Sequence, residues 1–207
     1  CHSHLHDRKK LAENIAIYYG MVSCMDKYIG KILDHLEETG LAENTLIVFT
    51  TDHGHFYGHH GLMAKGPFHY EDMIRVPFLV SLPGRIPEGH RSEALQSLVD
   101  LAPSFLDLCG IEIPADMTGR SQLPVWEGRS GGTRDHVIVE HHHQPTTIHL
   151  RTLVTPRYKL SVYCNQPYGE LFDLEQDPGE IRDLWSDPGS ADLRARLIEE
   201  LLLAEMA

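Results

Sequence analysis

One short stretch, TTDHGHFYGHHGLMAKG at residues 50–66, gathers side chains that could do chemistry directly after the apolar run TLIVF (45–49). Asp52 offers a hard, anionic oxygen to a divalent cation, and the imidazole of His53 offers a nitrogen. Gly54 then lets the chain turn sharply away. The triplet therefore indicates either a metal site or an Asx-type turn after a strand, which the same residue types often form.

Lys65 adds a positive charge to the same stretch. It follows His53 by twelve residues, and the glycines between them let the loop fold back over the strand end. An ammonium group beside a metal supplies the charge that a tetrahedral oxyanion ester requires. A solvated surface lysine would look the same in the sequence, so the surrounding elements must decide.

Those elements predict an α/β sheet with helical cover. The runs TLIVFTTD (45–52) and VPFLVSLP (76–83) are typical of buried strands. Before them, apolar residues recur at spacings of three and four, which is typical of a long amphipathic helix ended by Gly40. The apolar face of this helix comprises Leu11, Ile15, Tyr18, Val22, Met25, Ile29, Leu33 and Leu36.

Ligands of parallel α/β sheets bind beyond the carboxyl ends of the strands. We therefore expect Asp52 at the end of a central parallel strand. Its carboxylate should lie in a cleft lined by His53, His60 and Lys65.

Further along, DLAPSFLDLCG (100–110) is typical of a helix with Asp100 as N-cap, Pro103 in the first turn and Gly110 at the exit. Residues 115–135 are rich in Gly, Arg, Ser and Pro, and we expect them to form a connection. They separate the predicted α/β part, residues 1–130, from a smaller unit.

That smaller unit, residues 131–207, is predicted to be an α+β subdomain. The segments HVIVEHH, LRTLVTPRYKLSVYC and GELFDL predict short antiparallel strands. A last helix is expected to start at Ser190 and to pack through Leu193, Leu197 and Leu201.

Composition limits the classes of partner. The net charge of -12 argues against nucleic acid or an anionic membrane as a general partner, and no apolar run is long enough to span a membrane. The scattered cysteines Cys1, Cys24, Cys109 and Cys164 are expected to be buried or free thiols, which favours a reducing compartment without excluding export. The first residues, CHSHLHDRKK, are neither a signal peptide nor an initiating methionine, so we expect a chain cut at its front.

The segment TTDHGHFYGHHGLMAKGPFHYEDMIRVPFLVSLPG is similar to the second-half signature of the sulfatase family, in the alkaline phosphatase superfamily. The resemblance continues through SLVDLAPSFLDLCGI and LRTLVTPRYKL, and it ends with GELFDLEQDPGEIRDLW. It implies the C-terminal part of an alkaline-phosphatase-like sandwich, with helices on a mostly parallel sheet and a small α+β subdomain.

The same resemblance assigns roles. Asp52 and His53 match metal ligands, Lys65 matches the residue that contacts the sulfate and the leaving-group oxygen, and His60 matches a recurrent histidine near the pocket. The metal implied is divalent, with Ca²⁺ favoured by the family and Mg²⁺ or Mn²⁺ open. His55 and His59 match no required position and are expected to be polar loop residues. His141, His142 and His143 are expected to be strand-end residues that at most border the pocket, since adjacent strand residues cannot all face one ion.

Two features of the family are missing from this sequence. Sulfatases convert a cysteine or serine in a C/S-x-P-x-R motif to formylglycine, and they use a further pair of aspartates as metal ligands. No cysteine here is followed by x-P-x-R. Formylglycine is therefore expected in a missing N-terminal half of the catalytic domain.

The sequence thus predicts part of a metal-dependent sulfuric ester hydrolase, inactive alone, that acts on a small-molecule sulfate ester with the N-terminal half as partner. Assembly into an oligomer stays open. One alternative is a phosphonate or phosphate monoester hydrolase of the same superfamily, because the Asp-His pair suits both groups. Another is a non-catalytic structural fragment with half a site.

Overall fold

The computed structural model describes residues 7–142 and 148–206. Its helices are α1 (Arg8–Glu38), α2 (Glu71–Ile74), α3 (Leu101–Leu108), α4 (Leu123–Trp126) and α5 (Ala191–Glu205), with 3₁₀ turns at Ala42–Asn44, His59–Gly61, Leu98–Asp100 and Pro188–Ser190. Its strands are β1 (Ile47–Phe49), β2 (Leu79–Ser81), β3 (Val137–His142), β4 (His149–Val154), β5 (Tyr158–Tyr163) and β6 (Gly169–Asp173). Within this described part, no helix is both long and apolar enough to cross a membrane.

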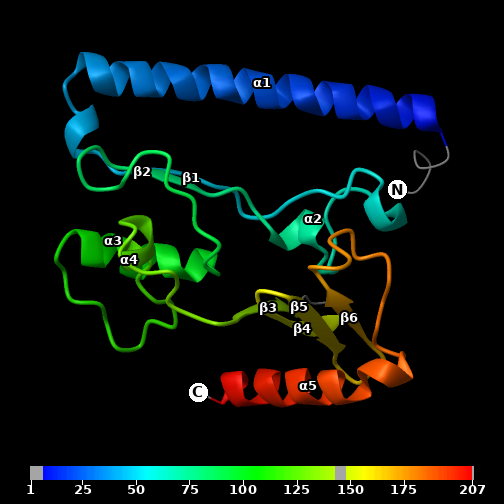
Figure 1. Cartoon of the computed structure of the whole chain (residues 1–207). Helices are drawn as coiled ribbons and strands as arrows, with labels where there is room; N and C mark the ends of the chain where they lie inside the picture. Colours follow the sequence, from blue (N-terminus) through cyan, green and yellow to red (C-terminus); the bar gives the residue numbers. More distant parts are fainter. Residues whose placement is uncertain (1–6, 143–147, 207) are drawn as a thin grey trace.

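The long predicted helix is α1, which runs along the side of the molecule opposite α5 (Figure 1). Asp7 is its N-cap and accepts a hydrogen bond from the backbone N–H of Lys10 at 3.1 Å. Gly40, with φ of +69°, follows its end as predicted. No residue of α1 is buried, and Met25 on the predicted apolar face is 57% exposed.

The prediction that residues 45–49 form a central parallel strand is wrong within the described chain. There β1 pairs with β2 alone, and the pairing is antiparallel, with Ile47 opposite Ser81. A parallel pair needs a crossover, usually an α-helix long enough to carry the chain back. Here the only helical segments of the connection are the 3₁₀ turn His59–Gly61 and the four-residue α2, and β2 begins beside the end of β1. The pair is also partly exposed, with Phe49 at 41%.

The helix α3 forms with Asp100 at its N-cap position, as predicted, but the Asp100 side chain makes no capping hydrogen bond to α3. Ser97 is instead the N-cap of the preceding 3₁₀ turn, Leu98–Asp100. Its side chain accepts the backbone N–H of Asp100, and the carboxylate of Asp100 accepts the backbone N–H of Ser97 at 2.9 Å, which together form a capping box. Asp100 is 1% exposed and also pairs with Arg134 and accepts from Gln122 Nε2. The burial of this carboxylate is tolerated because these donors surround it. Their bonds attach residues 120–134 to the start of α3.

Residues 115–135 are more than a connection, contrary to the prediction. They contain α4, where Val125 is 0% exposed and Trp126 is 3% exposed. Trp126 donates its indole N–H to Gln96 at 2.9 Å, which satisfies the polar atom of a buried ring. Together with Leu123 these side chains form the centre of one apolar cluster, against which Leu46, Phe78, Val80, Ile86, Ala94, Leu101 and Leu108 pack.

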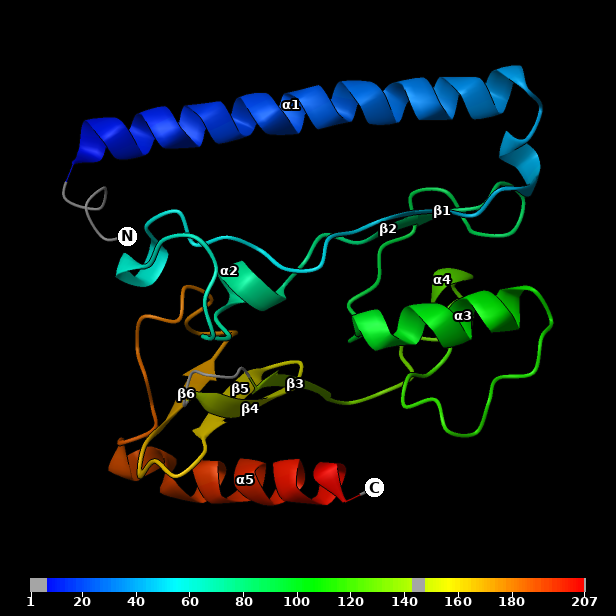
Figure 2. The same ribbon diagram turned by 180° about the vertical axis from the view of Figure 1, so that it is seen from behind.

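The predicted C-terminal strands form one antiparallel sheet in the order β3-β4-β5-β6. One face of it buries Leu153, Leu160 and Leu171 against Leu197 and Leu201 of α5, as predicted. Ser190 directly precedes α5, so the predicted start of this helix is correct. Figure 2 shows α5 along one side of the sheet and α2 on the other side.

All residues of the α4 cluster precede residue 130 in the sequence, and all residues of the α5 cluster follow it. This arrangement is compatible with the division into residues 1–130 and 131–207, which stays a prediction. Cys24, Cys109 and Cys164 are free and exposed, whereas Cys1 lies outside the described residues.

Candidate functional site

The histidine-rich stretch folds into a compact loop after β1. The backbone N–H of Phe56 donates to the carbonyl of Ala64 at 3.1 Å, and that of Gly58 donates to the carbonyl of Leu62 at 2.8 Å. Gly58 has φ of +101°, which a glycine adopts without steric cost, and His60 at the tip has φ of +52°. The loop therefore folds back on itself, as the glycine spacing predicts.

Asp52 and His53 form a close pair at the start of this loop. The Oδ1 atom of Asp52 accepts the backbone N–H of His53 at 3.0 Å, and this bond is the main reason why the pKa of Asp52 is lowered. The side chain of Asp52 is 81% exposed, and its Oδ2 lies 3.5 Å from Nε2 of His53. The carboxylate is thus ionised and open to solvent.

The His53 ring is oriented by the backbone of the next residue, Gly54. Nδ1 lies 2.8 Å from the carbonyl oxygen of Gly54, and a carbonyl can only accept, so Nδ1 carries the proton. In the neutral form of this ring the lone pair is on Nε2, the atom 3.5 Å from Oδ2 of Asp52. Metal-ligating histidines are typically held in this way through the other ring nitrogen.

The donors of this pair fit only part of a metal shell. Across residues 7–142 and 148–206, no group of three or more His, Cys, Asp or Glu side chains could hold a metal ion. Ca²⁺ takes six to eight ligands, and Mg²⁺ takes six. A carboxylate and an imidazole from this chain would therefore need further oxygen ligands from elsewhere.

Gly54 brings this pair close to α2. Its backbone N–H donates to the carbonyl of Met73 at 2.9 Å. A Cβ atom at Gly54 would overlap the backbone carbonyl of Asp72. This glycine is therefore required for the close approach of two backbones, rather than for the turn alone.

His60 is held between α2 and the aromatic residue that precedes it. Its ring stacks on that of Tyr70, with 3.8 Å between centroids and 6° between planes. Its Nε2 lies 3.7 Å from Oδ2 of Asp72, and its side chain is only 12% exposed. Burial lowers the pKa of His60, although the charge of Asp72 partly opposes this shift. A neutral imidazole in a fixed orientation is the result.

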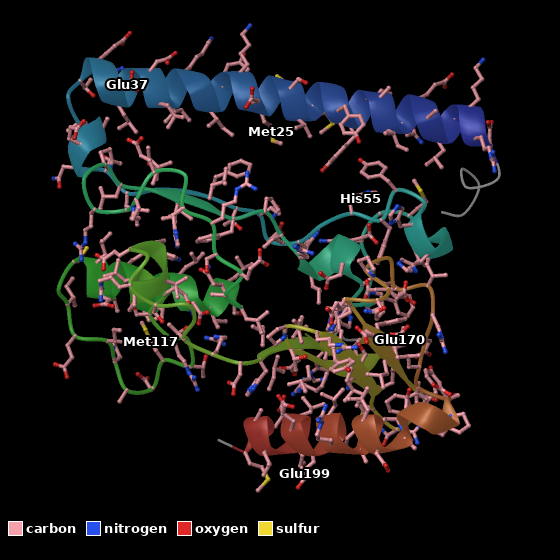
Figure 3. All side chains as sticks on the ribbon, viewed as in Figure 1. Met25, Glu37, His55, Met117, Glu170 and Glu199 are labelled. Carbon is pink, nitrogen blue, oxygen red and sulfur yellow. The ribbon has the colours of Figure 1, made fainter. Side chains whose placement is uncertain are left out.

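His59 differs from its neighbour in exposure. Its Nδ1 lies 2.9 Å from Oδ1 of Asp72, but its side chain is 72% exposed. This geometry fits the predicted polar loop residue. His55 faces the other way, toward α1: its ring stacks on Tyr57 at 3.7 Å, and Tyr57 in turn lies 4.6 Å from Tyr18. Figure 3 labels His55 in the loop that lies beneath α1.

Lys65 is exposed and follows Ala64 at the base of the loop. It lines a shallow pocket with loop residues that include Phe56 and Phe68. The structure thus gathers the end of β1, the loop and α2 into one region. A single cleft shared by Lys65, Asp52, His53 and His60 stays a prediction.

Several residues that orient this region were not predicted from the sequence. Tyr70 donates its hydroxyl to Oε1 of Glu170 on β6 at 2.9 Å, and Tyr163 on β5 donates to Oε2 at 2.8 Å. Burial, followed by the nearby charge of Glu170, raises the pKa of both tyrosines. Both hydroxyls therefore stay protonated and donate to the same carboxylate.

An ion-pair cluster also connects the C-terminal sheet to α2. The ammonium group of Lys159 on β5 pairs with Glu180 and lies 3.3 Å from Oε1 of Glu71 on α2. Glu180 also accepts the backbone N–H of Glu71 at 2.6 Å. Burial raises the pKa of Glu180. The start of α2 is thus attached to the C-terminal sheet by charged hydrogen bonds.

The buried His69, just before α2, makes a further contact with the C-terminal sheet. Nδ1 of His69 lies 2.8 Å from the hydroxyl of Thr152, which lies 2.7 Å from the hydroxyl of Ser161. Burial lowers the pKa of His69 to about 4. His141 of β3 lies 6.4 Å from the His69 ring, whereas His142 lies against His149 at 3.9 Å and His143 is outside the described residues. The first two are at the end of β3, as expected.

Two protein families match the sequence. The Sulfatase family matches residues 3–111. The family of N-sulphoglucosamine sulphohydrolase C-terminal domains matches residues 58–206. The two matches overlap over residues 58–111, which include the second half of the loop and α2.

The chain is 34% identical over 168 residues to an N-acetylglucosamine-6-O-sulfatase of Bacteroides thetaiotaomicron, covering 78% of this chain and 30% of that protein. It is 33% identical over 175 residues to an arylsulfatase of Clostridium perfringens, covering 83% of this chain and 36% of that protein. The chain therefore spans only about a third of the length of these relatives.

Solved structures show the same likeness. One, in complex with its substrate D-glucosamine-2-N,6-O-disulfate, has a TM-score of 0.83 and 31% identity over 89% of this chain and 39% of its own. The phosphonate monoester hydrolase of Agrobacterium radiobacter has a TM-score of 0.87 and 28% identity over 95% of this chain and 42% of its own. The predicted alkaline-phosphatase-like α/β fold is confirmed. With two family matches and relatives of this identity, the chain belongs to the sulfatase family, whose members are sulfuric ester hydrolases.

Proposed function

We propose that the chain supplies part of the metal and sulfate site of an enzyme that hydrolyses small-molecule sulfate esters. The observation that carries this proposal is the family match across the loop and α2, where the Asp52–His53 pair and the half-buried His60 lie. A relative with a bound sulfated glucosamine supports a sugar sulfate as one substrate class.

Each side chain has a role that its environment suits. Asp52 and Nε2 of His53 would hold a divalent cation, Ca²⁺ by resemblance, which when bound polarises the ester oxygens. Lys65 is exposed, and its ammonium group would neutralise charge on the sulfate and the leaving-group oxygen. His60 is neutral near pH 7 because burial lowers its pKa, so it would donate one hydrogen bond from a ring nitrogen.

We further propose that an N-terminal half of the catalytic domain completes the site. It would carry the formylglycine nucleophile and the further metal ligands. The apolar residues that α1 and the β1–β2 pair leave exposed are a surface of the kind that such a partner would cover: Ile17, Tyr19, Met21, Met25, Tyr28, Ile32, Phe49 and Leu79. Without that partner, the chain alone would not turn over a sulfate ester.

A phosphonate or phosphate monoester hydrolase is the second candidate. It is favoured by the structural likeness to the Agrobacterium radiobacter enzyme. Both reactions require a metal, a cation for the oxyanion and a nucleophile, so Asp52, His53 and Lys65 do not separate them. The names of the curated relatives favour the sulfate ester.

The test is to express the chain together with the upstream part of its coding sequence and to compare substrates. Hydrolysis of p-nitrophenyl sulfate, glucosamine 6-sulfate and a phenylphosphonate ester would be measured side by side. Our proposal predicts faster hydrolysis of the sulfates. Preference for the phosphonate would establish the second candidate, and a protein with no activity on any of the three would contradict both.

A further inference from the structure

The C-terminal sheet has a second buried face, and it carries buried polar side chains as well as apolar ones. Alternation along the strands puts Leu153, Leu160 and Leu171 against α5, and it puts Thr152, Lys159 and Ser161 on the opposite face. Lys159 is 1% exposed and Ser161 is 2% exposed, so this face is also covered. Residues 69–71 cover it, through the bonds of His69, Tyr70 and Glu71.

Tyr70 has two roles in this contact. Its ring is the surface on which His60 stacks, 3.8 Å away, and its hydroxyl is fixed by Glu170. Glu170 accepts a second hydroxyl, from Tyr163 on the neighbouring strand, which holds the carboxylate itself. The side chain of Tyr70 thus connects His60 to Glu170 of β6. Figure 3 labels Glu170 in the crowded region between α2 and the sheet.

A second attachment acts on the same histidine. Asp72 lies 3.7 Å from His60, and it follows Glu71 in the first turn of α2. Glu71 is held on one side by Lys159 and on the other by Glu180. The carboxylate beside His60 is thus placed by a helix that the C-terminal sheet fixes at its first residue.

From these contacts we propose that Tyr70 and Glu170 are positioning residues for His60, so that the C-terminal sheet sets the orientation of this side chain in the sulfate site. The residues act in series: Tyr163 and Glu170 fix the hydroxyl of Tyr70, and the ring of Tyr70 fixes His60. The proposal rests on the proposed function for its catalytic meaning. The geometry of the His60 ring can be measured without any turnover.

The experiment is NMR of the histidine ring protons in the 207-residue chain. The signals of His60 are assigned as those lost in His60→Gln. Stacking on an aromatic face shifts ring protons upfield, so His60 should be upfield of exposed His35 and should show nuclear Overhauser contacts to Tyr70.

Tyr70→Phe keeps the ring but removes the bond to Glu170, and Glu170→Leu removes the acceptor. Both variants should lose most of the upfield shift and the contacts between the two rings. Glu170→Gln keeps an acceptor oxygen and should retain them, which a loss of stability alone would not explain. Tyr168→Phe is the matched control. The exposed Tyr168 ring lies 5.2 Å from Tyr163, but its hydroxyl is not one of the groups that connect Glu170 to His60 in our proposal.

A native backbone amide spectrum shows that a variant is folded. If Glu170→Leu does not fold, Tyr70→Phe decides. An unchanged His60 shift in folded Tyr70→Phe would overturn the proposal, as would an equal loss in Tyr168→Phe. None of these results depends on sulfate hydrolysis, so failure of the proposed function would leave them readable.

Discussion

Lys159 and Glu180 form an ion pair in which both side chains are only 1% exposed. Glu71 and its backbone N–H are the further partners that make this burial tolerable. The pair joins β5 to the start of α2, and therefore joins the C-terminal sheet to the region of the candidate site.

Removing one member of this pair should be costly. Lys159→Ala leaves the buried carboxylate of Glu180 without its cation, so we expect a loss of about 3–5 kcal/mol in the free energy of unfolding. Lys27→Ala, at an exposed position of α1, is the control and should change it by less than about 0.5 kcal/mol. Urea unfolding measures both. A Lys159 variant as stable as the control would show that the pair contributes nothing.

His69 should make stability depend on pH. Its pKa is about 4 in the folded chain, because burial disfavours the charged ring, and 6.5 is the ordinary value. Above pH 6.5 neither state is protonated and His69 has no effect. As the pH falls from 6.5 to 4, only the unfolded state gains the proton. The free energy of unfolding should therefore fall by roughly 3 kcal/mol.

His69→Gln should remove this part of the pH dependence, while His35→Gln, on exposed α1, should leave it unchanged. Unfolding free energies at pH 7 and pH 4.5 provide the comparison. Equal pH dependence in wild type and His69→Gln would contradict a buried, neutral His69.

Gly54 and Gly20 provide a matched pair of glycine substitutions. A Cβ at Gly54 meets the carbonyl of Asp72, whereas a Cβ at Gly20 meets nothing within 4 Å. Gly54→Ala should therefore destabilise the chain by about 1–3 kcal/mol or more. Gly20→Ala, inside α1, should stabilise it by about 0.5–1 kcal/mol. Thermal unfolding of the two variants tests the close approach of the Gly54 and Asp72 backbones. An upward shift of the unfolding midpoint in both variants would refute this close approach.

Divalent metal should bind weakly to the chain alone. Asp52 and His53 supply one carboxylate and one imidazole, well short of the six or more ligands that Ca²⁺ and Mg²⁺ take. Titration calorimetry should show no affinity tighter than the millimolar range, on the order of 10⁻³ M or weaker. Micromolar affinity that survives Asp52→Ala would contradict the assignment of these ligands.

The sequence predicted the elements whose signals are local. The spacing of apolar residues in α1 and α5, Gly40 after α1 and the alternation in β3–β6 all lie within one element. They do not depend on the rest of the chain. The Gly and Pro content of segment 115–135 predicts a connection and gives no signal for α4, because the burial of α4 depends on residues as distant as Leu46.

The candidate site was predictable only in part. Asp52, His53, His60 and Lys65 were named because they lie close together in the sequence and match a family signature. Tyr70 and Glu170 are 100 positions apart, and nothing in the spacing indicates that they bond. The same holds for Lys159, whose burial comes from strand alternation combined with a partner, α2, on the second face.

The central claim is that this chain holds part of a sulfatase site which another part of the protein completes. Its most direct test is the rate of p-nitrophenyl sulfate hydrolysis by three proteins: the 207-residue chain, the chain with its upstream half, and the latter with Lys65→Ala. We predict no turnover by the first, metal-dependent turnover by the second, and a rate lower by roughly a hundredfold or more in the third, as when one oxyanion donor is lost. Robust metal-dependent hydrolysis by the 207-residue chain alone would contradict the claim.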